Sequence, residues 1–272
     1  ISGDTDLENQ SSINHYRKAS HLLRHLAPDC LQSYHIRGRM VELPEEIIDE
    51  IDFYMYQTGH SAKESDKEMC YQMPEYFLTN YPVKPLINSE PCYESIGYAG
   101  NMYGRFHQFD IRRAAWQSLL AGASAGITYG AGGVYSWHEY GKHFSPCIGE
   151  GFDMPHPWQI ALHYPGAWDY SDIKHIFCEY KITDLNPRQD ILLNETKEIR
   201  IAEYQNRYFI YVPENTTIKL KIDINDIESI TILDLETRRK EIGNKYKKDG
   251  ICCLEMHTFG HDVLYIVELK NI

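Results

Sequence analysis

The stretch Val83-Lys-Pro-Leu-Ile-Asn-Ser-Glu90 places an apolar run directly before a carboxylate. The run has the length of a buried strand, and Pro91 follows at once, where the ladder of a central strand cannot continue. A helical pattern that we expect to break at Pro74 precedes it, and an amphipathic pattern capped by Asp110 follows it. A strand between two helical patterns is typical of a parallel α/β sheet.

The same alternation recurs along the first 180 residues. Four further strand candidates are Ile1-Ser2, Leu31–His35, Ile51–Gln57 and Gly126–Gly130. Polar residues at the carboxyl ends of successive strands build the active site of a (β/α)8 barrel. Five strands cannot close such a barrel, because the open edges would stay unpaired. We therefore expect the second part of a (β/α)8 TIM barrel, with three N-terminal strands missing or supplied by another segment or chain.

The pattern changes after Asn186-Pro187. Short runs with partial alternation are separated by turn-like segments, which predicts a small all-β sandwich. The runs are Ile199–Glu203, Tyr208–Val212, Thr217–Lys221, Ser229–Leu233, Ile251–Glu255 and Val263–Leu269. We expect a catalytic barrel domain over residues 1–186 and a β-sandwich accessory domain over residues 187–272.

Composition excludes several classes of protein. The 272 residues are 43% hydrophobic and 24% charged, which is ordinary for a globular chain, and the net charge is −12. Nucleic acids and anionic membranes bind basic surfaces, so we expect neither as a partner. Residues 114–137 carry no charge, but their glycines and polar side chains argue against a membrane-spanning helix.

The opening Ile1-Ser2-Gly3-Asp4 has no initiator Met and no signal-peptide pattern, so we expect the true amino terminus to lie upstream. The seven cysteines include no CxxC pair. An odd count argues against a complete disulfide framework, and we expect a reducing, cytoplasmic location.

Glu90 is the strongest catalytic candidate, because a carboxylate that ends a buried strand lies at the mouth of a barrel. The alternative is an ion-paired Glu at a strand end. Retaining glycoside hydrolysis needs a second carboxylate about 5–5.5 Å away. Asp4, at another strand end, is the best-placed partner. Glu94 and Asp6 lie further into their loops, and Asp52 begins its strand.

Other side chains near the strand ends could bind a sugar, by hydrogen bonds to hydroxyls or by ring stacking. The first set is His35, Gln57 and His60, and the second is Tyr93, Tyr129, Tyr135 and Trp137. His21 and His25 share a helix face, but no third ligand accompanies them, so we expect no metal. No nucleotide-binding motif is present, and we expect no cofactor.

Four segments together resemble one family, the apiosidase-like (β/α)8 glycoside hydrolases of glycoside hydrolase family 140 and its relatives. They are residues 52–60, 84–94, 110–116 and 121–130. Ser2-Gly3-Asp4 resembles the Gly-Gly-Asp that ends an earlier strand there. The C-terminal region resembles a β-sandwich often found behind that barrel and labelled collagen-binding, a label that is no evidence of collagen binding.

The resemblance implies a Glu nucleophile at Glu90 and an Asp acid/base at Asp4, the two residues chosen above. It also implies hydrolysis of plant cell-wall, pectic-type oligosaccharides, with an oligosaccharide or polysaccharide as the partner and retention as the outcome. Two departures are the absent first strands and the stretch Gly130–Trp137, where the family has a bulkier, His-containing sequence. A non-catalytic carbohydrate-binding protein and an inactive barrel fragment stay open as alternatives.

Overall fold

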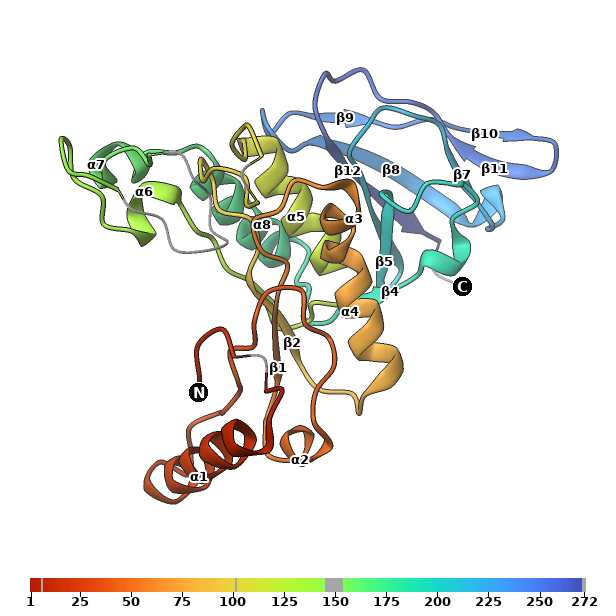
Figure 1. The fold of residues 1–272 in the computed structure, drawn as a ribbon. Coiled ribbons are helices and arrows are strands. Elements are labelled where there is room, and N and C mark those ends of the chain that lie inside the picture. The colour runs from red at the N-terminus through yellow and green to blue at the C-terminus, as the bar shows by residue number, and fades with distance from the viewer. Residues whose placement is uncertain (6, 101, 145–153, 271–272) are drawn as a thin grey trace. The chain divides into compact units, whose positions relative to one another are not determined.

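The structure, a computed structural model, describes residues 1–5, 7–100, 102–144 and 154–270 (Figure 1). Contacts between residues divide the chain into two compact units. Unit 1 comprises Ile1–Phe106 and Ala123–Leu162, and unit 2 comprises His107–Gly122 and His163–Ile272. The domain boundary at residues 186 and 187 stays a prediction.

A parallel sheet forms the centre of unit 1. Its order is β1 (Tyr54–Gln57), β2 (Leu86–Glu90) and β3 (Gly126–Ile127), with both neighbouring pairs parallel. Two extended segments precede these strands: residues 1–5 and 33–36 pair through a parallel bridge and through His35 N–H, which donates to the Ile1 carbonyl at 2.9 Å. The mixed α/β class is confirmed. The described strands form no closed barrel, so the (β/α)8 architecture stays a prediction.

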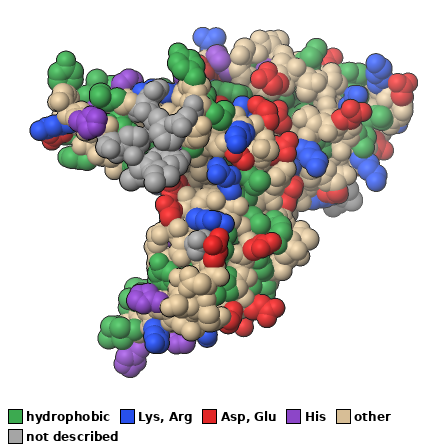
Figure 2. Space-filling model, in the orientation of Figure 1, with side chains coloured by type: hydrophobic (Ala, Val, Ile, Leu, Met, Phe, Trp, Pro, Cys, Tyr) green, Lys and Arg blue, Asp and Glu red, His purple; other side chains and the backbone are tan. Residues whose placement is uncertain are grey.

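Unit 1 contains six described helices, of which α1 is the longest. They are α1 (Gln10–Leu26), α2 (Glu45–Ile48), α3 (Glu64–Lys67), α4 (Met69–Asn80), α6 (Gly132–Tyr135) and α7 (Trp158–Ala161). The α1 helix begins where the Asn9 side chain accepts a hydrogen bond from Ser12 N–H at 2.9 Å. Figure 2 shows hydrophobic and His side chains gathered over α1, whose Leu22 and Leu26 are exposed.

The prediction that Pro74 breaks the helix is wrong, because α4 continues through it. Proline removes one backbone hydrogen bond from a helix interior. Here Pro74, Met73 and Phe77 are all buried. Met73 and Phe77 pack in one core with Tyr54 and Leu86 of the sheet, and this burial offsets the lost bond.

Two antiparallel sheets form most of unit 2. The six-stranded sheet has the order β4-β5-β6-β12-β8-β9, and the three-stranded sheet has the order β10-β11-β7. The strands are β4 (Asn186–Pro187), β5 (Arg200–Tyr204), β6 (Arg207–Val212), β7 (Ile218–Leu220), β8 (Ile227–Asp234), β9 (Lys240–Ile242), β10 (Lys245–Lys248), β11 (Ile251–Leu254) and β12 (Val263–Leu269). Side chains of both sheets, among them Ile210 and Leu254, share one buried core. The six predicted runs correspond to β5, β6, β7, β8, β11 and β12.

Unit 2 also contains α5 (Gln108–Leu120), α8 (Gly166–Glu179) and two 3-10 turns at Gln189–Ile191 and Ile224–Asp226. Asp110 is not the residue that caps α5 from outside, as the sequence suggested. It lies in the first turn, where its carboxylate accepts the N–H of His107 at 2.9 Å in a capping box. Among the described helices, none combines the length and the apolar character needed to cross a bilayer.

Candidate active site

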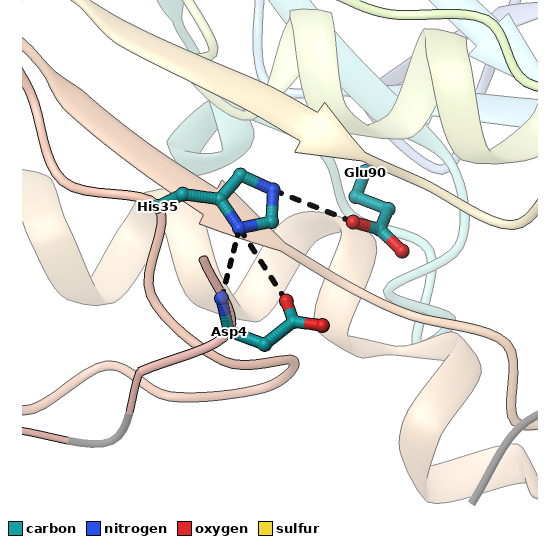
Figure 3. Close-up of side chains that lie close together, drawn as sticks. All are labelled: Asp4, His35 and Glu90. Atoms are coloured by element: carbon teal, nitrogen blue, oxygen red, sulfur yellow. Dashed lines mark hydrogen bonds and ion pairs between the residues drawn. The ribbon is translucent and has the colours of Figure 1, made fainter. Parts of the chain in front are cut away.

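Three side chains meet at the carboxyl ends of neighbouring parallel segments of unit 1: Asp4, His35 and Glu90 (Figure 3). Asp4 and His35 come from the paired segments 1–5 and 33–36, and Glu90 is the last residue of β2. One carboxylate oxygen of Asp4 and one of Glu90 lie within 4.8 Å of each other. The Asp4 side chain is 70% exposed and the Glu90 side chain 19%, so the two carboxylates differ in access to water.

The imidazole of His35 lies between the two carboxylates (Figure 3). Its Nδ1 atom accepts the backbone N–H of Asp4 at 3.3 Å and lies 3.4 Å from Oδ1 of the same residue. Its Nε2 atom lies 3.4 Å from Oε2 of Glu90. One ring therefore contacts both members of the carboxylate pair.

Two further groups face Glu90. The Nε2 atom of His60 lies 3.2 Å from Glu90 Oε1, and a hydrogen bond joins Tyr93 to Glu90. Burial raises the pKa of Tyr93 well above its usual value, and the nearby charges of Glu90 and Asp4 add to the shift. Within the described residues, no Lys or Arg forms an ion pair with Asp4 or Glu90, so these carboxylates are surrounded by neutral or weakly basic donors.

Gln57 holds Asp4 in place. Its side-chain amide donates to Asp4 Oδ1 at 2.6 Å and to the Ile36 carbonyl at 2.5 Å, and the residue is buried. The register of β1 against β2 shifts between Tyr56 and Gln57, which re-aims the end of the strand. Asp4 itself has a left-handed backbone with φ of 45°, a conformation that Asp tolerates better than bulkier residues.

Aromatic rings extend from the carboxylate pair. The Tyr93 ring lies 4.5 Å from the His60 ring and 5.6 Å from the Tyr135 ring, measured between centroids. Gly130 lies against Tyr93 so closely that a Cβ atom there would come within 2.1 Å of the ring. Glycine at position 130 therefore leaves the space that the Tyr93 ring occupies next to Glu90.

Trp137 and Trp158 form a second aromatic feature of unit 1. Their rings stack with centroids 4.6 Å apart and planes at 9°, and Trp137 is 60% exposed. Trp137 has φ of 47°, a strained backbone for so bulky a residue. Trp158 was not singled out from the sequence, because no pattern links two tryptophans that pair only in the folded chain.

The rival carboxylates have other partners. Glu94 is buried and accepts the Tyr129 hydroxyl at 2.6 Å. Asp52 pairs with Arg24 at 2.9 Å and lies two residues before β1, at the amino end of that strand, whereas Glu90 lies at the carboxyl end of β2. Asp6 lies outside the described residues. Among the described candidates, Asp4 and Glu90 are therefore the two carboxylates that lie next to each other.

The loop that follows His35 borders a cavity of about 500 Å³. Arg37, Arg39 and Met40 line it together with Leu7 and Glu8. These lining residues follow the segments 1–5 and 33–36 along the chain, and Asp4, His35 and Glu90 are not among them.

In the part of the chain that the structure describes, Asp4, His35 and Glu90 are also the His and carboxylate side chains whose ligand atoms lie close enough for a cation. Exposed acidic groups are common in proteins without a metal, although catalytic zinc sites hold their ion with three protein ligands and a water. That the protein needs no metal stays a prediction.

Comparisons with known proteins show what the chain is similar to. A solved structure described as a glycoside hydrolase has a TM-score of 0.83, with 18% identity over 98% of this chain and 63% of its own. A glycoside hydrolase family 5 structure from Bacteroides vulgatus ATCC 8482 has a TM-score of 0.82, with 20% identity over 98% of this chain and 61% of its own. The chain therefore shares their fold and spans less than two thirds of their length.

A comparison with curated protein sequences gave no match. The model of the family described as apiosidase-like, catalytic domain, matches residues 1–184. This match covers more than half of the chain and includes Asp4, His35 and Glu90. The protein belongs to the apiosidase-like family.

Proposed function

We propose that the protein is a glycoside hydrolase that cleaves pectic-type plant cell-wall oligosaccharides with retention, using Glu90 as the nucleophile and Asp4 as the acid/base. The observation that carries this proposal is the approach of the two carboxylates to within 4.8 Å. Retaining enzymes separate their carboxyl groups by about 5–5.5 Å, whereas inverting enzymes need about 6.5–9.5 Å to admit a water. The parallel segments that carry the pair would then belong to a (β/α)8 barrel.

The reaction proceeds in two steps. Protonated Asp4 gives its proton to the glycosidic oxygen while a Glu90 oxygen attacks the anomeric carbon, which breaks the bond to the leaving group and forms a glycosyl ester on Glu90. Ionised Asp4 then takes a proton from water, whose oxygen attacks the same carbon and releases Glu90. Two inversions at one carbon give net retention.

The surroundings of each carboxylate suit these roles. Glu90 faces Tyr93, whose hydroxyl donates to it, and His60, which donates when its proton lies on Nε2; such donors favour the ionised form that a nucleophile requires. Asp4 is mostly exposed, so its carboxyl can reach both a leaving group and a water molecule. Gln57 keeps Asp4 in place without neutralising its charge.

The aromatic side chains supply surfaces for sugar rings. Tyr93 and Tyr135 extend from Glu90, and the exposed face of Trp137 is supported from behind by Trp158. Stacking on an aromatic ring contributes about 0.5–1.5 kcal/mol beyond the buried area. We expect Trp137→Ala to raise KM for a long oligosaccharide about 3- to 10-fold, with little change for a short aryl glycoside.

Sugar release from apiose-, arabinose- and glucose-linked oligosaccharides tests the proposal. Wild type is compared with Glu90→Gln and with the matched control Glu94→Gln, which changes a neighbouring carboxylate that is bonded to Tyr129. We expect release by wild type and by Glu94→Gln, and a loss of at least about 1,000-fold in Glu90→Gln. Release that survives in Glu90→Gln contradicts the catalytic assignment. Binding of the panel without release by wild type supports the carbohydrate-binding alternative instead.

A further inference from the structure

We propose that His35 is the positioning residue that sets the two carboxylates in opposite protonation states, by presenting a hydrogen-bond donor to Glu90 and an acceptor to Asp4. The inference rests on the proposed function and deepens it. A retaining pair needs one ionised and one protonated carboxyl at the start of the reaction. Identical chemical groups less than 5 Å apart need something in the site that distinguishes them.

The backbone defines the tautomer of His35. The N–H of Asp4 points at Nδ1 at 3.3 Å, and a backbone N–H can only donate, so Nδ1 must be the unprotonated nitrogen. Neutral His35 then carries its proton on Nε2, the atom that lies 3.4 Å from Glu90 Oε2. A donor aimed at Glu90 favours its ionised, nucleophilic form.

The same tautomer acts in the opposite sense on Asp4. The Nδ1 lone pair lies 3.4 Å from Asp4 Oδ1, so an ionised Asp4 would place two acceptors face to face. Protonation of Asp4 removes this repulsion. The imidazole therefore favours a proton on Asp4 and disfavours one on Glu90, which is the assignment that the first step requires.

The other described neighbours each act on one carboxylate. His60 and Tyr93 contact Glu90, and the Gln57 amide donates to Asp4 at 2.6 Å, a contact that by itself favours ionised Asp4. Of the described neighbours in this site, His35 is the residue that contacts both (Figure 3).

The backbone of His35 also fixes the segment that carries Asp4. Its N–H donates to the Ile1 carbonyl at 2.9 Å, and its carbonyl accepts the Ser2 hydroxyl at 3.0 Å and the Thr5 N–H at 3.4 Å. These backbone bonds fix the position of residues 1–5, and therefore of Asp4, relative to the His35 ring. A substitution of the side chain leaves these backbone bonds available, so the loss of the ring can be tested without loss of the segment.

Two variants separate the two contacts. In His35→Asn the amide reaches about as far as Nδ1, so the contact with Asp4 is kept and the donor to Glu90 is lost. In His35→Gln the amide reaches about as far as Nε2, so the donor to Glu90 is kept and the acceptor beside Asp4 is lost. Each variant removes one of the two contacts, so we expect either to lose about 10- to 100-fold in kcat on a natural linkage.

The leaving group then distinguishes the variants. A 4-nitrophenolate leaves without a proton, so a 4-nitrophenyl glycoside of the responding sugar should restore kcat in His35→Gln, where only acid catalysis is impaired. His35→Asn should stay impaired on both substrates, because its nucleophile is affected. Equal losses on both substrates in both variants would show a merely structural role and overturn the proposal.

Nitrogen-15 NMR of the resting wild-type protein near pH 7 tests the tautomer without any substrate. We expect the His35 signals, assigned by their loss in His35→Gln, to report an unprotonated Nδ1 and a protonated Nε2. A proton on Nδ1, or on both nitrogens, would overturn the inference. If no sugar is released by wild type, the proposed function fails, and the NMR result still decides which nitrogen carries the proton.

Discussion

Two clusters of charged side chains differ in how completely their charges are balanced. In unit 2, Arg112 is 1% exposed and contacts three carboxylates, Asp262 at 2.6 Å, Glu236 at 2.9 Å and Asp169 at 3.1 Å. In unit 1, Asp4 and Glu90 share one imidazole, with contacts of 3.3–3.4 Å, and no described Lys or Arg pairs with either. The Arg112 cluster neutralises its charges through short bonds, whereas no described Lys or Arg neutralises the Asp4–Glu90 pair.

This difference in charge neutralisation indicates that the Arg112 cluster stabilises the fold, whereas the Asp4–Glu90 pair takes part in the reaction. A buried guanidinium whose carboxylate partners are removed from water must keep those partners, because an uncompensated buried charge is costly. Two carboxylates left close together are a local cost to the fold, and such costs are common at reactive sites. The Arg112 cluster should therefore respond to mutation in stability, and the Asp4–Glu90 pair in activity.

The largest effect on stability is expected at Arg112. Replacement by Met leaves the buried Asp262 without its cation, while Asp169 keeps its 2.6 Å pair with Arg238, and we expect a cost of about 3–5 kcal/mol in the free energy of unfolding. Urea denaturation followed by circular dichroism measures the loss. The control is Lys240→Met, whose exposed 2.8 Å pair with Glu179 should cost about 1 kcal/mol or less. Similar losses in the two variants would contradict the contrast drawn between the clusters.

A second effect on unit 2 depends on pH. Asp234, at the end of β8, is buried, which opposes ionisation, but its bonds to Thr237, His261 and backbone N–H groups outweigh burial and lower its pKa to about 2. Because the pKa of Asp234 is lower in the folded state, ionised Asp234 contributes its full stabilisation at pH values above about 4, the ordinary pKa of Asp. This stabilisation is lost as the pH falls through about 2.

Asp234→Asn should therefore lose about 2 kcal/mol at pH 7 and show a flatter fall in stability between pH 4 and 2 than wild type. Denaturation curves at several pH values measure both quantities. Asp249→Asn, at an exposed left-handed turn position, is the control and should change little. An acid profile of Asp234→Asn that parallels the wild-type profile would rule out this role for Asp234.

The smallest effect on stability is expected at the proposed nucleophile. Glu90→Gln removes one of two neighbouring negative charges, so the free energy of unfolding should stay within about 1 kcal/mol of wild type or rise. Glu94→Gln, which disturbs a buried bond to Tyr129, should lose about 1–2 kcal/mol. A large loss in Glu90→Gln would place Glu90 among the structural carboxylates and weaken the comparison.

Much of the site could be predicted from strand ends. Asp4, His35 and Glu90 all follow short apolar runs, and parallel segments bring their carboxyl ends to one edge, so their meeting was foreseeable. The bridging of the two carboxylates by His35 was not, because it depends on ring orientation and on the Asp4 backbone N–H. The sequence predicted His35 as a residue that binds sugar hydroxyls, and that role stays a prediction.

Other features lacked a sequence signal for physical reasons. Strands β9 and β10 lie at or near sheet edges and are polar and Lys-containing, so they carry little of the alternation that marked the other strands. The Trp137–Trp158 stack joins residues from separate turns, and only tertiary packing brings them together. The helix break expected at Pro74 failed because burial of the neighbouring side chains outweighs local propensity.

The stereochemistry of hydrolysis tests the central claim most directly. Proton NMR of the first sugar released from the responding oligosaccharide, recorded before mutarotation, identifies the anomer formed. The account predicts the same anomeric configuration as in the substrate, because carboxylates within 4.8 Å of each other suit a covalent intermediate on Glu90. An inverted first product would contradict the assignment of Glu90 as nucleophile.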